Sequence, residues 1–184
     1  MKTNKIIITV ISCFLFILNG KAQDKYFTKT GDINFFSKAP LENITADNKD
    51  VLSIINVETG EMAIQMKMID FTFEKALMQE HFNENYIESD KYPTATFKGT
   101  ITDFKNMSDT KKEHTVKGVL TIHGVSKNVE IKANFKKTNN TIDVDGNFIV
   151  ALKDYKIKIP KIVFINIAEN IKVTFKFNHQ PYTK

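Results

Sequence analysis

The sequence contains no arginine and no tryptophan, and it has a single cysteine, Cys13. Arginine is the residue that most often binds phosphate groups and guanine through paired hydrogen bonds, so its absence argues against nucleic-acid recognition. One cysteine cannot form an internal disulfide, and it cannot supply the several thiolates of a cysteine zinc site. The hydrophobic core must therefore stabilise the fold, and a chain of 184 residues is long enough for this.

The chain also has little excess of one sign of charge over the other. The chain has 26 basic residues, all lysine, against 21 acidic residues, and the two signs are mixed throughout. Lys2, Lys5 and Lys21 precede residue 23, so from there onward 23 lysines face 21 acids, a net charge of about +2 (23 − 21). This balance predicts no nucleic-acid partner.

Only one long apolar run occurs, Ile6–Leu18, and it is shorter than the roughly 20 residues of a membrane-spanning helix. Lysines precede the run, and the small residues Gly20 and Ala22 follow it, which is typical of a secretory signal peptide. We predict a signal peptide over residues 1–22 and one mature domain over residues 23–184. The mature protein is then expected to be periplasmic or secreted and not to span a membrane.

A lipoprotein is the alternative, since Val10–Cys13 resembles a lipoprotein processing sequence. Phe14–Leu18 continues the apolar run after the cysteine, however, where a lipoprotein normally becomes polar. This layout favours an ordinary signal peptide.

The remainder of the chain alternates between apolar and polar residues with a period of two, which predicts β-strands. Short turns between neighbouring strands imply antiparallel pairing, and eight or nine one-sided strands must close into a barrel or stack as a sandwich. Two of the strands are long, which favours a barrel. The predicted strands are Gly31–Ala39, Val51–Val57, Glu61–Phe73, Thr94–Asp103, two within His114–Thr138 joined by a turn at His123–Gly124, Thr141–Leu152 and Asn170–Asn178.

Two segments depart from this pattern. Glu74–Asn85 has Leu77, Met78 and Phe82 at helical spacing, which predicts a short amphipathic helix on the barrel. Ile159–Ala168 is apolar after a proline and is expected to form a helical turn or a covering loop.

His81, between Glu80 and Glu84, is the strongest candidate for catalysis or metal binding. No second histidine follows it at a zinc-binding spacing, and the chain has no Gly-x-Ser-x-Gly nucleophile motif. Asp143–Gly146 resembles the start of a calcium loop but lacks the downstream acidic ligand. We therefore predict no catalytic residue, no metal site and no cofactor. His81 is expected to pack at the junction of helix and barrel with its ring hydrogen-bonded.

The acidic residues around this helix are expected to be solvated; they are Glu80, Glu84, Glu88 and Asp90.

Three segments, Phe82–Glu84, Tyr92–Phe97 and Gly118–Gly124, resemble the YceI-like family of exported bacterial proteins, and the similarity extends over Phe27–Phe177. The resemblance implies an extended, lipocalin-like, antiparallel eight-stranded barrel with one short helical insertion. It also implies an elongated apolar pocket, which in several relatives holds a polyisoprenoid chain or a similar amphiphile. Many isoprenoid binders have a histidine in the early strand, whereas Phe36–Leu41 has none, so their head-group contacts do not carry over.

Alternation alone favours an ordinary core, while the resemblance favours a lipid pocket. The resemblance thus implies an exported carrier of a polyisoprenoid or fatty-acid-like lipid. The alternative is a non-catalytic stress-response or protein-interaction module that uses the barrel as a scaffold. A third hypothesis, a hydrolase or isomerase, is not supported, because the sequence shows no convergent set of acid, base and nucleophile residues. The sequence leaves a homodimer open. The expected pocket residues are Ile33, Phe35, Ile64, Met66, Met68, Phe71, Phe73, Met78, Phe82, Phe97, Ile101, Leu120, Ile131, Ala133, Phe135, Phe148 and Phe175.

Overall fold

Alternating apolar residues form strands over most of the chain. The computed structural model describes residues 25–160 and 167–182, and this part of the chain contains nine strands. They are β1 (Lys25–Lys38), β2 (Asn43–Asn56), β3 (Glu61–Lys67), β4 (Thr72–Phe73), β5 (Thr94–Ile101), β6 (Lys112–Ile122), β7 (Val125–Lys137), β8 (Ile142–Ala151) and β9 (Asn170–Pro181).

Eight of these strands close into an antiparallel barrel in the order β1-β9-β8-β7-β6-β5-β3-β2, and the pairing of β1 with β2 completes the ring. The ninth, β4, has only two residues and pairs with β2 at Ala46 and Asp47. Each barrel strand has a neighbour on both sides, although β7 and β8 pair only over Ala133–Lys137 and Ile142–Gly146. The predicted extended, eight-stranded, antiparallel barrel with one short helical insertion is confirmed.

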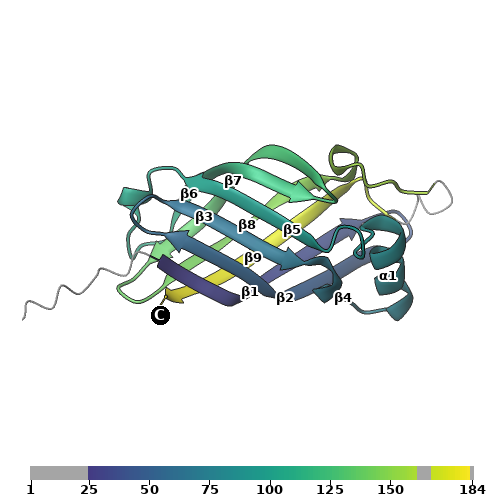
Figure 1. Cartoon of the computed structure of the whole chain (residues 1–184), viewed down its shortest axis with the longest axis horizontal. Coiled ribbons are helices and arrows are strands. Elements are labelled where there is room, and N and C mark those ends of the chain that lie inside the picture. The colour runs from purple at the N-terminus through teal and green to yellow at the C-terminus, as the bar shows by residue number, and fades with distance from the viewer. Residues whose placement is uncertain (1–24, 161–166, 183–184) are drawn as a thin grey trace, which may run out of the picture.

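The α-helix α1 (Ala76–His81) lies at one end of the barrel, and the C-terminal end of β9 lies at the other (Figure 1). A wider π-helical turn, η2 (Phe82–Tyr86), continues it. The described part of the chain also forms three short 3₁₀ turns: η1 (Met68–Asp70), η3 (Phe104–Asn106) and η4 (Leu152–Tyr155). The predicted helix over Glu74–Asn85 is therefore present, although its α-helical part is shorter.

Several predicted strands were wrong in extent. Strands β1 and β2 begin at Lys25 and Asn43, well before the predicted starts at Gly31 and Val51. The strand expected over Glu61–Phe73 ends at Lys67, because the chain bends into η1 and leaves the barrel wall. The amide of Met68 donates to the carbonyl of Pro93 at 2.9 Å, and the buried Met68 side chain faces the interior. The bend carries the chain across the end of the barrel towards α1.

The turn between β6 and β7 is a two-residue hairpin at the predicted position. His123 and Gly124 both have positive φ, 51° and 70°, as the common two-residue hairpin turn requires. Ile122 and Val125 flank the turn as register partners.

Some expectations fall on residues that the structure does not describe. The predicted signal peptide, residues 1–22, lies outside the described residues, as do positions 161–166 of the segment expected to cover the barrel. Within the described ranges, no helix combines the length and apolar character needed to cross a membrane.

The half of the barrel away from α1, called here the filled half, is packed with phenylalanine rings that lie against glycines. The ring of Phe97 covers the paired glycines Gly99 and Gly118, where an added Cβ would lie 2.6 Å and 2.8 Å from its Cζ atom. Phe175 covers Gly146 in the same way. Each of these glycines thus provides the space that a large ring occupies, so this half of the barrel forms a dense core.

Candidate ligand cavity

The other half of the barrel, beside α1, contains a cavity of about 460 Å³. Its lining is largely apolar, and it reaches the surface because the exposed residues Lys75, Leu77 and His81 contribute to it. A volume of this size lies within the roughly 300–1,000 Å³ that is usual for small-molecule sites. The cavity is therefore the principal candidate for a functional site.

Six strands provide the cavity wall, because alternate side chains of a strand point to the same face. Each strand contributes the inward residues closest to α1 and none from its distant half. The strand residues of the wall are Ser37, Phe35 and Ile33 on β1, Met66 on β3, Ala95 on β5, Ile122 and Leu120 on β6, Val150 and Phe148 on β8, and Ile171 and Val173 on β9. Ile44 of β2 and Phe73 of β4 add to the wall near the surface.

Ten of the seventeen residues expected to line a pocket do line this cavity: Ile33, Phe35, Met66, Met68, Phe71, Phe73, Met78, Phe82, Leu120 and Phe148. Six others line a separate cavity of only about 50 Å³ in the filled half: Ile64, Phe97, Ile131, Ala133, Phe135 and Phe175. Ile101 lines neither cavity. Contact with a ligand stays a prediction for all seventeen.

Sequence reasoning did not include the residues at the cavity mouth. Glu42, Lys75, Leu77, His81 and Tyr86 all contribute to the lining. They belong to loops and to the helical segment, where no period-two alternation marks the inward side. Only the folded chain brings them to the end of the barrel.

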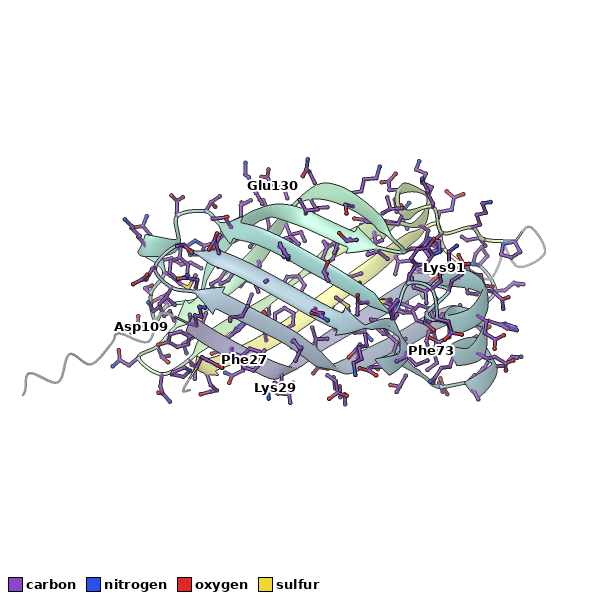
Figure 2. The ribbon with its side chains drawn as sticks, viewed as in Figure 1. Phe27, Lys29, Phe73, Lys91, Asp109 and Glu130 are labelled. Atoms are coloured by element: carbon purple, nitrogen blue, oxygen red, sulfur yellow. The ribbon has the colours of Figure 1, made fainter. Side chains whose placement is uncertain are left out.

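A cluster of four aromatic rings attaches the helical segment to the barrel. Phe82 of η2 lies 5.6 Å from Phe35, 5.7 Å from Phe71 and 5.1 Å from Phe73, measured between ring centroids. No residue of α1 or η2 is fully buried. Figure 2 shows Phe73 at the α1 end of the barrel. The helical segment is thus held mainly through Phe82 and covers the cavity without a core of its own.

Polar groups of the cavity lie close to its mouth. Lys75 Nζ and Glu42 Oε1 form an ion pair of 2.5 Å between the helical segment and the β1–β2 loop. The hydrogen bond with Glu42 raises the pKa of Lys75. Ser37 Oγ accepts a hydrogen bond of 2.9 Å from the amide of Ala168, which ties the chain before β9 to β1. A ligand with one polar end would meet these groups at the mouth.

The expectation for His81 was wrong. Its side chain is exposed at the cavity mouth, and no hydrogen bond joins its ring to another described residue. The reason is that α1 ends at His81, and the helical face that meets the barrel is carried by Phe82 and Met78 instead. Leu77, expected on that face, is 61% exposed.

A second polar cluster lies at the same end of the barrel. His123 Nε2 is 2.8 Å from Glu88 Oε2, and its Nδ1 is 3.2 Å from the carbonyl oxygen of Tyr155. The ring of Tyr92 lies against His123 with 4.3 Å between centroids. These contacts join the loop before β5, the β6–β7 turn and the chain after β8. Glu88 is therefore not simply solvated, as expected, and the hydrogen bond from His123 lowers its pKa.

Three residues of this region have left-handed backbone conformations: Glu88 (φ 47°), His123 (φ 51°) and Lys156 (φ 58°). Such conformations are uncommon outside glycine and persist where surrounding contacts hold them. The histidine–glutamate contact is one such restraint. No sequence motif indicated it, since the two residues are 35 positions apart.

Ser53 and His179 form a buried pair in the filled half that resembles a nucleophile and its base. His179 Nε2 lies 2.8 Å from Ser53 Oγ, and Nδ1 lies 3.0 Å from the carbonyl oxygen of Ile142. Burial lowers the pKa of His179 to about 4, so the ring is neutral and both its nitrogens are satisfied. Neither residue lines either cavity, which makes the pair a structural contact.

No group of three His, Cys, Asp or Glu side chains within residues 25–160 and 167–182 is arranged to hold a metal ion. The calcium-like segment Asp143–Gly146 is part of strand β8. There Asp145 forms an ion pair of 2.5 Å with Lys111 and accepts a hydrogen bond from Asn134.

Comparison with known proteins agrees with this architecture. The model of the YceI-like domain matches residues 18–179, starting within the predicted signal peptide. None of the curated proteins compared with the chain matches it.

Among solved structures, a polyisoprenoid binding domain from Saccharophagus degradans implicated in plant cell wall breakdown is 14% identical, with a TM-score of 0.75 over 86% of this chain and 99% of that one. Burkholderia cenocepacia BcnA is 16% identical, with a TM-score of 0.64 over 80% and 95%. The Campylobacter jejuni YceI protein is 17% identical, with a TM-score of 0.63 over 79% and 90%. At these identities the likeness concerns the fold.

Proposed function

The chain belongs to the YceI-like domain family, and from this premise we propose that it is a non-catalytic binding protein for an amphiphilic lipid. The observation that carries the proposal is the cavity of about 460 Å³ within the barrel, lined by apolar side chains and open beside α1. The apolar chain of the ligand occupies the barrel, and its polar end remains at the mouth.

The lining chemistry supports a flexible apolar chain as the ligand. Met66, Met68 and Met78 contribute thioether side chains, which adapt their shape to different ligands. Aromatic rings from Phe35 and Phe148 give the wall additional apolar area. The charged groups of Glu42 and Lys75 are confined to the mouth, so the interior offers no counter-ion for a buried charge.

The ligand classes that fit are a polyisoprenoid and a fatty-acid-like lipid. The Saccharophagus degradans neighbour is described as a polyisoprenoid binding domain, which supports the first class by analogy of fold. In the proposal the protein acts after export, in the periplasm or outside the cell, with residues 1–22 removed as a signal peptide.

Mass spectrometry of the purified protein tests the proposal. The protein is expressed with its N-terminal segment in a bacterial host, purified without detergent and measured intact under native conditions. An organic extract of the same sample identifies any bound molecule. We expect a lipid close to one per chain, and we expect delipidated protein to bind a fluorescent fatty acid.

The alternative, an interaction module that uses the barrel as a scaffold, predicts a different result. Protein free of lipid that also fails to bind the fluorescent fatty acid contradicts the lipid-binding proposal. A fluorescent acid that binds but is not displaced by unlabelled fatty acids also contradicts it, because binding would then be unspecific.

A further inference from the structure

Four side chains separate the two cavities of the barrel. Ile33, Met66, Leu120 and Phe148 line both the cavity of about 460 Å³ and the cavity of about 50 Å³. Each is the deepest lining residue of the large cavity on its own strand, on β1, β3, β6 and β8 respectively. We call these four residues the septum. It closes the large cavity partway along the barrel.

The depth of the large cavity follows from strand geometry. On β1 the lining runs from Ser37 to Ile33, five of the strand's 14 residues. Four intervals of about 3.3 Å give roughly 13 Å along the strand, and less along the axis because barrel strands are tilted. The helical segment adds a few ångströms at the mouth. One leaflet of a bilayer, about half of a 30 Å hydrocarbon core, has a comparable depth.

Beyond the septum the barrel is occupied by its own side chains. Phe135 is 1% exposed, and Phe175 and Phe177 stack with 5.7 Å between centroids. Gly146 lies beneath the Phe175 ring, and Gly31 lies beneath the Phe177 ring. A ligand chain that passed the septum would have to displace several of these rings, whose burial stabilises the fold.

We propose that the septum sets the maximum chain length of the ligand, so that the barrel accepts a single chain of about fatty-acyl length and excludes longer polyisoprenoid chains. The inference rests on the proposed function. It narrows the ligand to fatty-acid-like amphiphiles and short isoprenoids. Phe148 is the main determinant of this length limit. Its side chain is only partly buried, and its ring centroid lies 6.2 Å from that of Phe175 in the filled half.

A chain-length series tests this. Unbranched fatty acids from octanoic to docosanoic acid, together with farnesol and a long polyprenol, compete with a fluorescent fatty acid for the delipidated protein. Each added methylene that enters the cavity should strengthen binding by up to about fourfold. We expect this gain to stop near dodecanoic to tetradecanoic acid, whose extended chains match a depth of roughly 13 Å plus the mouth. We expect farnesol to bind and the polyprenol not to bind.

Phe148→Ala joins the two cavities and should move the limit to acids that are a few carbons longer. Phe148→Leu, a smaller change, should move it less and serves if the alanine variant does not fold. Phe177→Ala is the matched control. It removes a ring of the filled half that does not line the large cavity, so it should lower the melting temperature and leave the length limit in place.

Three results overturn the inference. Binding that strengthens with length up to the polyprenol contradicts a septum. An unchanged length limit in folded Phe148→Ala and Phe148→Leu contradicts the role of Phe148. Failure of every acid and alcohol to bind refutes the proposed function itself, and the inference with it, and is recognised by the absence of fluorescent-acid binding.

Discussion

Gly146 on β8 and Phe175 on β9 are register partners, and the Phe175 ring occupies the space that a side chain at residue 146 would need. A Cβ atom on residue 146 would lie 2.6 Å from Phe175 Cζ and 3.0 Å from the carbonyl oxygen of Lys132. The relationship shows how the filled half is built: small residues on one strand receive large rings from the next.

The first prediction concerns this contact. Gly146→Ala should destabilise the protein by about 1–3 kcal/mol, because the ring must move within a packed core. Asn147→Ala, on the outward side of the same strand, is the control and should change stability by less than about 0.5 kcal/mol. Urea unfolding monitored by circular dichroism measures both. Equal stability of the two variants would show that the Phe175 ring adapts without cost.

A pair of alanines on opposite sides of the septum gives the second prediction. Ala95 lines the large cavity, and Ala133 lines only the small one. Ala133→Phe should overpack the filled half and cost about 1–3 kcal/mol of unfolding free energy. Ala95→Phe should place its ring in the large cavity, reduce fatty-acid binding and leave the melting temperature nearly unchanged. The reverse pattern would contradict the assignment of the hollow and filled halves.

The third prediction concerns pH and the buried His179. Its pKa is about 4 in the folded protein, below the ordinary value of about 6.5 that applies in the unfolded chain. The unfolded chain therefore binds the proton first as the pH falls. The stability that His179 contributes is fully present above pH 6.5, decreases between about pH 6.5 and 4, and changes by about 3 kcal/mol in total.

His179→Gln isolates this effect. The variant should be less stable than the parent at pH 7, and the difference should shrink as the pH falls from 6.5 to 4. Chemical denaturation at several pH values measures the difference. A gap between parent and variant that stays constant over this window would show that His179 does not titrate as its burial implies.

The fourth prediction concerns the contact of Glu88 with His123. Glu88→Gln removes the carboxylate that the His123 ring meets at 2.8 Å, so the loops joined by this cluster should open more often. Hydrogen exchange should become faster at the amides of Tyr92 and Ile157. Glu84→Gln, an exposed residue with the same change in charge, is the control and should leave these amides unaffected.

NMR titration gives a second readout of the same contact. In the parent protein the Glu88 carboxyl should titrate below the ordinary range, because the hydrogen bond from His123 lowers its pKa. His123→Ala should return the pKa towards the ordinary value. A Glu88 pKa that does not respond to this substitution would mean that the contact is not maintained in solution.

The fifth prediction concerns processing. The mature protein should begin near Gln23 and carry no lipid on its N-terminus, since the segment over residues 1–22 has the layout of a cleavable signal peptide. Intact-mass measurement of protein from the periplasm and medium decides this. A product that begins at an acylated Cys13 would establish the lipoprotein alternative instead.

The sequence by itself determined most of the strands, their antiparallel pairing and the short turn at His123–Gly124, because a period of two and a hairpin turn are local properties. It missed the first parts of β1 and β2. It also indicated which side chains point inward. Closure into an eight-stranded barrel followed from the number of one-sided strands and from the family resemblance. The long strand predicted over Glu61–Phe73 failed because a tertiary contact, Met68 with Pro93, bends the chain there.

Only the tertiary structure decided where the barrel is hollow. Phe35 and Phe135 are both inward residues of alternating strands, yet the first lines the large cavity and the second is buried in the filled half. Alternation records the side of a strand and not the distance along the barrel axis. Whether a given level of the barrel is hollow or filled depends on which glycine lies beneath each ring and on where the helical segment closes the end. Both are set by contacts between residues far apart in the chain.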